Sequence, residues 1–214
     1  MEPTDENLRA WEEVHRHRAT AGGDPGLPPP VRHALADLQG KRVLVVRCST
    51  GEAAGELAEL GATVTGVDSS TEALALARER WSRILWIQGE TQSLPRELRR
   101  GRFDLVYAGW NADGVEDLDA WAAGIASALQ PGGDLLMFDE HPAAKAVDGL
   151  MHWREDYFAD DRGPGSWRLG QIVTAVARAG LALRALEEYP QQPGNPRHHD
   201  ARVPGTFLLH AQRR

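Results

Sequence analysis

The sequence predicts an α/β fold in which short buried strands alternate with amphipathic helices. The stretch of residues 43–70, VLVVRCSTGEAAGELAELGATVTGVDSS, contains this unit most clearly. Residues 43–46 and 63–67 are short apolar, β-branched runs, which are typical of strands covered on both faces. Between them, residues 52–60 carry alanine and leucine at near-helical spacing, and Gly61 follows as a helix-ending residue. Strand, helix and strand in this order predict a parallel βαβ unit.

The same stretch predicts a cofactor site. A turn of small residues, CSTG, joins the first strand to the helix and ends at Gly51. Asp68 lies at the carboxyl end of the second strand, beside this turn in a parallel sheet. The open backbone at a helix N-terminus can take a charged group, and a carboxylate can bind two sugar hydroxyls. Together these features predict a site for a ribose-bearing cofactor.

The alternation continues to the end of the chain. We expect helices over residues 71–81, 117–129 and 167–179, and strands over 83–88, 103–107, a run ending at Asp139, 181–189 and 204–211. The glycine pattern of dinucleotide-binding enzymes does not fit the first turn, where only Gly51 and Gly55 are glycine. The cofactor is therefore of another class.

Residues 43–70 resemble motifs I and II of the class I S-adenosylmethionine (SAM)-dependent methyltransferases. The family pattern is a strand followed by Asp-x-Gly-Cys-Gly-x-Gly, a helix, and Gly-Ala-x-Val-x-Gly-Val-Asp-x-Ser. The residues that match are Cys48, Thr50, Gly51, Leu57, Ala58, Gly61, Ala62, Val64, Gly66, Val67, Asp68 and Ser70. Residues 167–190 resemble one branch of the same family, and the resemblance extends from about Gly40 to Ala211.

Three positions depart from the family pattern: Val45 replaces the acid, Arg47 the first glycine and Ser49 the second. A branch of the family has Leu-x-Leu-Gln-Cys-His-x-Gly at this turn, and Arg47 and Ser49 resemble variants of its Gln and His. Arg47 brings a charge to the turn, and this charge either faces the cofactor carboxylate or turns to solvent.

The resemblance implies a Rossmann-like, seven-stranded, mostly parallel sheet with helices on both faces. It implies the strand order 3-2-1-4-5-7-6, with the last strand antiparallel. It also implies SAM as the cofactor. The residues expected to bind it are Arg47, Cys48, Ser49, Gly51, Asp68, Ser69, Glu90, Thr91 and Gly109.

Residues 1–40 are expected to form lid helices, the second over 31–38, joined by the loop AGGDPGLPPP, ahead of a methyltransferase-like domain over 41–214. Trp11 and His15 of the first helix are candidate substrate residues; alternatively, Trp11 packs on the core and His15 faces water. Trp110 and Asn111, directly after the fourth strand, are placed to contact substrate.

An insertion around residues 143–166 is expected to form a substrate cap. Aromatic residues in such a polar loop give area and rigidity to a pocket, and Tyr157 and Phe158 are the candidates. The alternative is a satellite hydrophobic cluster beneath a long loop.

His141 is the candidate catalytic residue. It follows the fifth strand at the edge where open α/β sheets bind ligands, and it has Asp139 and Glu140 beside it. A histidine in this setting can accept a proton from the acceptor as the methyl group is transferred. Alternatively, alignment of the two substrates suffices without a base. No metal site is predicted, because the acids at 113–119 lie at a helix start and complement its dipole.

Composition limits the partners. A net charge of −7 argues against a broad nucleic-acid interface, and no apolar run is long enough to span a membrane. One cysteine excludes an internal disulfide and suits a cytoplasmic location. We therefore expect a cytoplasmic monomer or homodimer that methylates a small-molecule acceptor at oxygen, nitrogen or sulfur. The alternative is a non-catalytic protein of the same fold, with weakened or lost SAM binding and a regulatory or assembly role.

Overall fold

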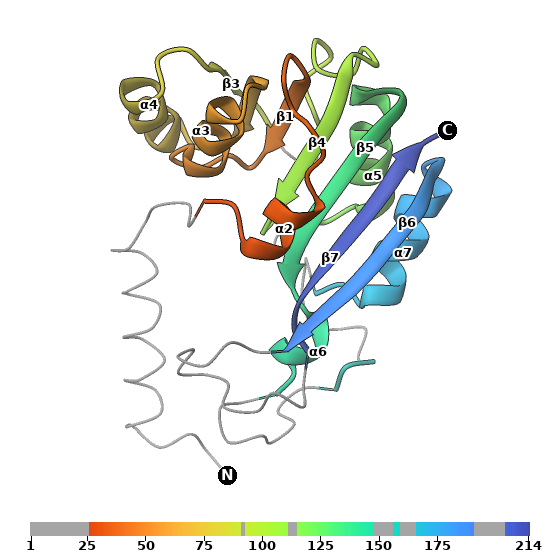
Figure 1. The fold of residues 1–214 in the computed structure, drawn as a ribbon. Helices are drawn as coiled ribbons and strands as arrows, with labels where there is room; N and C mark the ends of the chain where they lie inside the picture. Colours follow the sequence, from red (N-terminus) through yellow and green to blue (C-terminus); the bar gives the residue numbers. More distant parts are fainter. Residues whose placement is uncertain (1–25, 91–92, 111–114, 148–155, 159–165, 191–203) are drawn as a thin grey trace, which may run out of the picture.

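A seven-stranded sheet with the order β3-β2-β1-β4-β5-β7-β6 forms the centre of the molecule (Figure 1). The computed structural model describes residues 26–90, 93–110, 115–147, 156–158, 166–190 and 204–214. Neighbouring strands from β3 to β5 pair in parallel, and β7 runs antiparallel to both β5 and β6. The strand order and the antiparallel last strand are as predicted. The strands are β1 (Arg42–Val46), β2 (Thr63–Asp68), β3 (Leu85–Gln88), β4 (Phe103–Gly109), β5 (Leu129–Glu140), β6 (Leu181–Pro190) and β7 (Pro204–Arg213).

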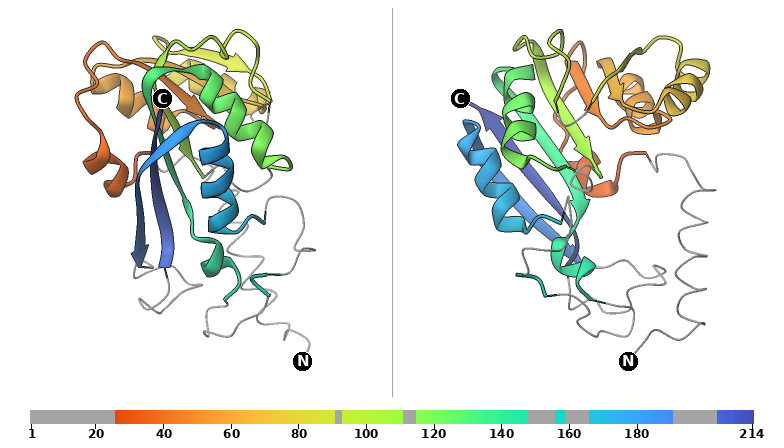
Figure 2. Two further views of the ribbon diagram at one scale, coloured as in Figure 1. Left: turned by 90° about the vertical axis from the view of Figure 1, so that its right-hand side faces the viewer. Right: turned by 180° about the vertical axis from the view of Figure 1, so that it is seen from behind.

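Helices cover both faces of the sheet, as expected. They are α2 (Pro29–Ala34), α3 (Glu52–Glu59), α4 (Thr71–Arg80), α5 (Leu118–Ala128), α6 (Pro142–Lys145) and α7 (Leu169–Arg178). α5 and α7 lie together on one face, and α3 and α4 lie on the other (Figure 2). Each face has its own core, one around Trp121 and Ile172 and the other around Leu57 and Leu74. None of the helices in the described ranges is long and apolar enough to cross a membrane.

Local sequence explains where the helices begin and end. Ser70 caps α4 by accepting a hydrogen bond from the Ala73 amide, and Asp117 caps α5 in the same way through Ala120. The predicted second helix over 31–38 is wrong in its bounds. α2 starts two residues earlier, because proline fits the first turn, and ends where Leu35 becomes extended (φ −69°, ψ 129°).

The carboxyl ends of the parallel strands all meet at one edge of the sheet. Backbone hydrogen bonds continue beyond the strands there: Cys48 donates to Val67 O at 3.1 Å, and Trp110 donates to Phe138 O at 2.8 Å. These bonds fix the first residues after β1 and β4 against their neighbours. The candidate site residues that the structure describes are therefore held on an ordered edge.

Candidate functional site

The turn between β1 and α3, residues 47–51, is hereafter the cofactor turn. Its backbone reverses through three residues in the left-handed region: Arg47 (φ 52°), Ser49 (φ 48°) and Gly51 (φ 89°). Such angles suit glycine and cost other residues free energy. Arg47 and Ser49 thus keep the conformation that glycine would favour, although their side chains depart from the family pattern. A Cβ on Gly51 would lie 2.5 Å from Trp86 Cη2, so only glycine fits there without a shift.

Asp68 connects the end of β2 to the cofactor turn. Its Oδ2 accepts a hydrogen bond from the Ser49 amide and its Oδ1 accepts one from the Ser70 amide, both at 2.9 Å. Each oxygen of an ionised carboxylate has room for a second hydrogen bond. Because the side chain is only half-buried, these remaining positions are accessible to hydroxyl groups of a ligand. Ser69, the next residue, is exposed at the same edge.

Arg47 reaches from β1 toward β4. Its Nη1 donates to the carbonyl of Trp110 at 3.2 Å. Trp110 itself has a left-handed backbone (φ 56°), and its ring meets the ring of Phe138 edge-on at 5.3 Å. Gly109, the last residue of β4, directly precedes it. The guanidinium therefore lies along the edge between the cofactor turn and the end of β4.

The structure gives fewer contacts for the other predicted cofactor and substrate residues. Glu90 is exposed just after β3, and Gly89 ties that strand end to β2 through a 2.9 Å bond to Asp68 O. Thr91 and Asn111 lie outside the described residues, as do Trp11 and His15 and most of the predicted lid and cap.

His141 is buried where β5 passes into α6, and protein groups face both of its ring nitrogens. Nδ1 accepts a hydrogen bond from the Ala143 amide at 3.1 Å and so caps α6. The proton of the neutral ring is therefore on Nε2, which lies 2.9 Å from Glu188 Oε1 on β6. This short contact brings the Glu188 carboxylate against the ring nitrogen that carries the proton.

These surroundings act in opposite directions on the protonation of His141. Burial lowers the pKa of His141 below its ordinary value of 6.5, and the charge of Glu188 opposes that shift. The ring is neutral at neutral pH, as a general base requires. To accept a proton from an acceptor, however, Nδ1 would have to release Ala143. The role of His141 as a base stays a prediction.

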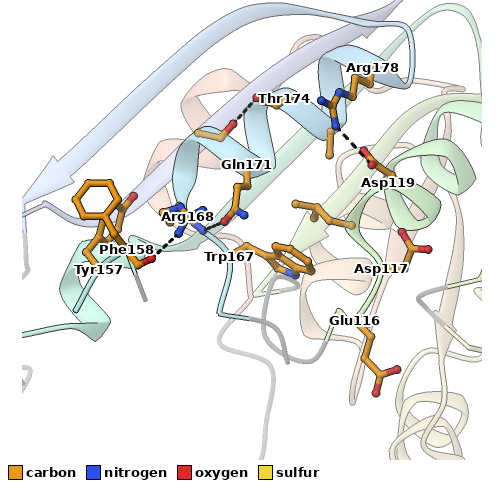
Figure 3. A pocket seen from close by; sticks show the side chains of 13 residues that line it. Glu116, Asp117, Asp119, Tyr157, Phe158, Trp167, Arg168, Gln171, Thr174 and Arg178 are labelled. Carbon is orange, nitrogen blue, oxygen red and sulfur yellow. Dashed lines mark hydrogen bonds and ion pairs between the residues drawn. The ribbon is translucent and has the colours of Figure 1, made fainter. Parts of the chain in front are cut away.

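Tyr157 and Phe158 line a cavity of about 790 Å³ between α5 and α7, hereafter the α5–α7 cavity (Figure 3). Glu116, Asp117 and Asp119 lie on its α5 side, and Trp167, Arg168 and Gln171 belong to the start of α7. Trp167 is one of the aromatic residues of the predicted insertion, but neither it nor Arg168 is among the predicted substrate residues, although an aromatic residue next to a strongly amphipathic helix is a visible signal. Glu188 was missed as well, because nothing in its local sequence indicates contact with His141.

Comparisons with known proteins agree with this geometry. Residues 43–133 match the family model described as a methyltransferase domain. A demethylmenaquinone methyltransferase of Chlorobaculum tepidum is 35% identical over 106 residues, 48% of this chain and 43% of that protein. An uncharacterized methyltransferase of Synechocystis is 34% identical over 109 residues, 50% of each chain. The chain thus spans about half the length of the curated relatives it matches.

A solved structure extends the likeness beyond the matched segment. The SAM-dependent methyltransferase of Mesorhizobium loti superposes with a TM-score of 0.70 at 24% identity, over 86% of this chain and 96% of that one. This likeness shows the fold, and the sequence match over residues 43–133 is to a methyltransferase domain. Over residues 43–133 the chain is thus similar to a methyltransferase domain, and residues 43–70, which resemble motifs I and II, begin that segment.

Proposed function

We propose that the protein transfers a methyl group from SAM to a small-molecule acceptor at oxygen, nitrogen or sulfur. The observation that carries the proposal is the position of Asp68. Its carboxylate is fixed against the cofactor turn by two backbone amides and keeps capacity for two further hydrogen bonds. A ribose offers two adjacent hydroxyls, which match this capacity.

The remaining residues of the edge suit the other parts of the cofactor. The backbone of Cys48, Ser49 and Gly51 forms a tight turn ahead of α3, where an approaching ligand meets little side-chain bulk. Arg47 is placed to bind a carboxylate by exchanging its bond to Trp110 O for a charged partner. Ser69, Glu90, Thr91 and Gly109 are proposed to complete the site around the adenosine.

The chemistry asks for alignment more than for activation. SAM supplies a methyl group on a positively charged sulfur, which is already a good leaving group. The acceptor's lone pair forms the new bond to the methyl carbon, and the pair of the broken C–S bond stays on sulfur. The acceptor's proton passes to water or to His141, which is neutral for that purpose. Holding the acceptor in line therefore accounts for much of the rate.

The acceptor is proposed to be a small molecule. The Chlorobaculum relative is named for an acceptor of that kind, demethylmenaquinone. A formal net charge of −7 disfavours nucleic acid as the substrate. Trp110, Asn111, Tyr157, Phe158, Trp11 and His15 are the proposed acceptor contacts, and we propose a monomer or homodimer in the cytoplasm.

One observation favours the non-catalytic alternative. Arg47 crosses to Trp110 along the edge where the cofactor would lie, so a guanidinium that failed to move would obstruct binding. In that case the domain would have a regulatory or assembly role without methyl transfer.

Calorimetric titration with SAM and with its demethylated product tests the proposal. Asp68→Ala should weaken binding more than about tenfold, because charged hydrogen bonds contribute roughly 1.5–3 kcal/mol. Asp134→Ala is the matched control: Asp134 is also a strand acid with a hydrogen-bonded partner, His210 at 2.9 Å, but it is the first β5 residue paired with β7, at the opposite end of that pairing from the carboxyl end of β5. No binding by the wild-type protein would overturn the enzymatic proposal, and equal affinity in both variants would overturn the role of Asp68.

A further inference from the structure

We propose that the α5–α7 cavity binds the planar aromatic ring of an uncharged methyl acceptor. The inference rests on the proposed function, since it names the class of acceptor for the same reaction. A volume of about 790 Å³ is within the usual range of small-molecule pockets and accommodates a substituted ring system.

The location of the cavity suits an acceptor site. One wall is the start of α5, which follows β4, and the other walls are residues 157–158 and one side of α7 along its length, which follow β5 (Figure 3). The start of α5 follows the carboxyl end of β4, a strand next to β1, on the edge that carries the cofactor turn and Asp68. Ligands of open α/β sheets bind outside these strand ends.

Trp167 gives the cavity a rigid aromatic wall. Its indole Nε1 donates to Val115 O at 2.7 Å, which ties the start of α7 to the segment before α5. The ring also packs against the α5–α7 core of the sheet and is only partly exposed. With its only polar atom already bonded, the ring presents apolar surface to a ligand. A flat aromatic partner packs on such a surface in offset or edge-on geometry.

Phe158 is a second ring at the cavity, and it is largely exposed. Its exposure of 72% is the largest among the large hydrophobic residues that the structure describes. It is nevertheless held in place, with Tyr157 edge-on at 5.1 Å and with the Arg168 guanidinium 6.0 Å from its ring centre. Arg168 also donates to Phe158 O at 3.1 Å. An anchored but exposed ring at a cavity is suited to covering a ligand.

The charged groups of the cavity favour an uncharged ligand, because the protein already uses them. Asp117 caps α5, Asp119 pairs with Arg178 at 3.7 Å, and Arg168 bonds to Phe158 O. Glu116 also has an interaction within the protein. A charged ligand would have to displace one of these partners, whereas the ring faces are available without such a cost.

Binding measurements with matched ring pairs test the inference. We would compare phenol-type compounds with their saturated cyclohexanol counterparts by ligand-observed NMR, with SAM titrated separately. The aromatic member of each pair should bind more tightly to the wild-type protein. Phe158→Ala should weaken that binding by about tenfold and leave SAM affinity unchanged. Leu76→Ala, which removes another exposed side chain on the distant α4, is the matched control and should change neither affinity.

The outcomes separate this inference from the proposed function. SAM binding without any preference for aromatic rings would overturn the inference and leave the proposed function standing. Ring binding without SAM binding would overturn the acceptor role. If a true acceptor is found, Phe158→Ala should raise its KM and leave kcat almost unchanged, and an unchanged KM would also overturn the role. Trp167→Phe, which keeps a ring but loses the bond to Val115, should retain the preference for aromatic ligands.

Discussion

The cofactor turn is held by backbone groups from two adjacent stretches of sequence, whereas the α5–α7 cavity is made of side chains from three separate segments. In the turn, hydrogen bonds to Asp68 and the left-handed backbone hold the peptide groups in position. The turn therefore keeps its shape with Arg47 and Ser49 in place of glycine. In the cavity, Trp167, Phe158 and Arg168 determine the surface themselves. A backbone site keeps its shape when side chains change, and a side-chain site changes with every substitution.

The largest effect is expected at His141, which lies outside both regions, where β5 passes into α6. If its ring accepts the acceptor's proton, His141→Asn should lower kcat by about 10²–10⁴-fold with SAM affinity nearly constant. Asparagine can still cap α6, so the folded structure should persist. Steady-state kinetics on a true acceptor provides the measurement. A variant with full turnover would show that catalysis proceeds by alignment alone.

The pH profile gives an independent reading of the same residue. Protonated imidazole cannot act as a base, and burial lowers the pKa of His141, so the rate should fall only below about pH 6.5. Glu188 opposes the effect of burial, and Glu188→Gln should therefore move this fall to still lower pH. If the wild-type protein and Glu188→Gln have the same dependence of rate on pH, Glu188 does not influence the pKa of His141.

In the cofactor turn, adding a side chain at a position that fits only glycine should reduce stability. Gly51→Ala combines left-handed strain with a clash against Trp86, and should lower the free energy of unfolding by roughly 2–5 kcal/mol. Gly132→Ala is matched for strain (φ 77°), but nothing lies within 4 Å of its added Cβ, so it should cost only about 1 kcal/mol. Urea unfolding of both variants measures the difference, and equal losses would contradict the steric argument.

Arg47 reaches from the cofactor turn to the residue after β4, and its removal should have an intermediate effect. If the guanidinium binds the cofactor carboxylate, Arg47→Gly should weaken SAM binding by about tenfold. Arg47→Lys should retain part of the affinity, because it keeps the charge but loses the planar fork. Tighter binding by the glycine variant would instead identify Arg47 as an obstruction.

The smallest expected effect is a gain. Ser49→Gly removes a side chain from a left-handed residue (φ 48°) and keeps the amide that binds Asp68, so stability should rise by about 0.5–1 kcal/mol. Thermal unfolding provides the measurement, and SAM affinity should remain the same. A loss of stability would mean that the Ser49 side chain makes a contribution larger than the strain.

The cofactor turn and its contact with Asp68 could be predicted from sequence. The residues involved lie close together in the sequence, and their contact depends on the order of the strands. Residues 43–70 gave both strands, the helix and the position of Asp68 beside the turn, and the structure has all of them. The left-handed backbone of Arg47 could not be predicted in the same way. Residues other than glycine rarely adopt it, and an arginine side chain does not indicate it.

The acceptor side could be predicted only as a list of residues. The sequence predicts Tyr157 and Phe158 as pocket aromatics, but their position beside α5 depends on how α7 packs. The bond from Trp167 to Val115 spans 52 positions, and the contact of His141 with Glu188 joins the ends of two strands that flank β7. Such pairings arise from tertiary packing and leave no periodic pattern in the sequence.

The single thiol of the chain gives the cofactor turn a natural reporter. Cys48 is fully buried between Arg47 and Ser49, and its amide is bonded to Val67 O. A disulfide reagent can therefore reach the sulfur only when the turn opens, and the labelling rate under native conditions counts those openings. Because a ligand that bridges β1, β2 and β4 would hold the turn closed, slower labelling in its presence would reveal occupancy without any assay of turnover.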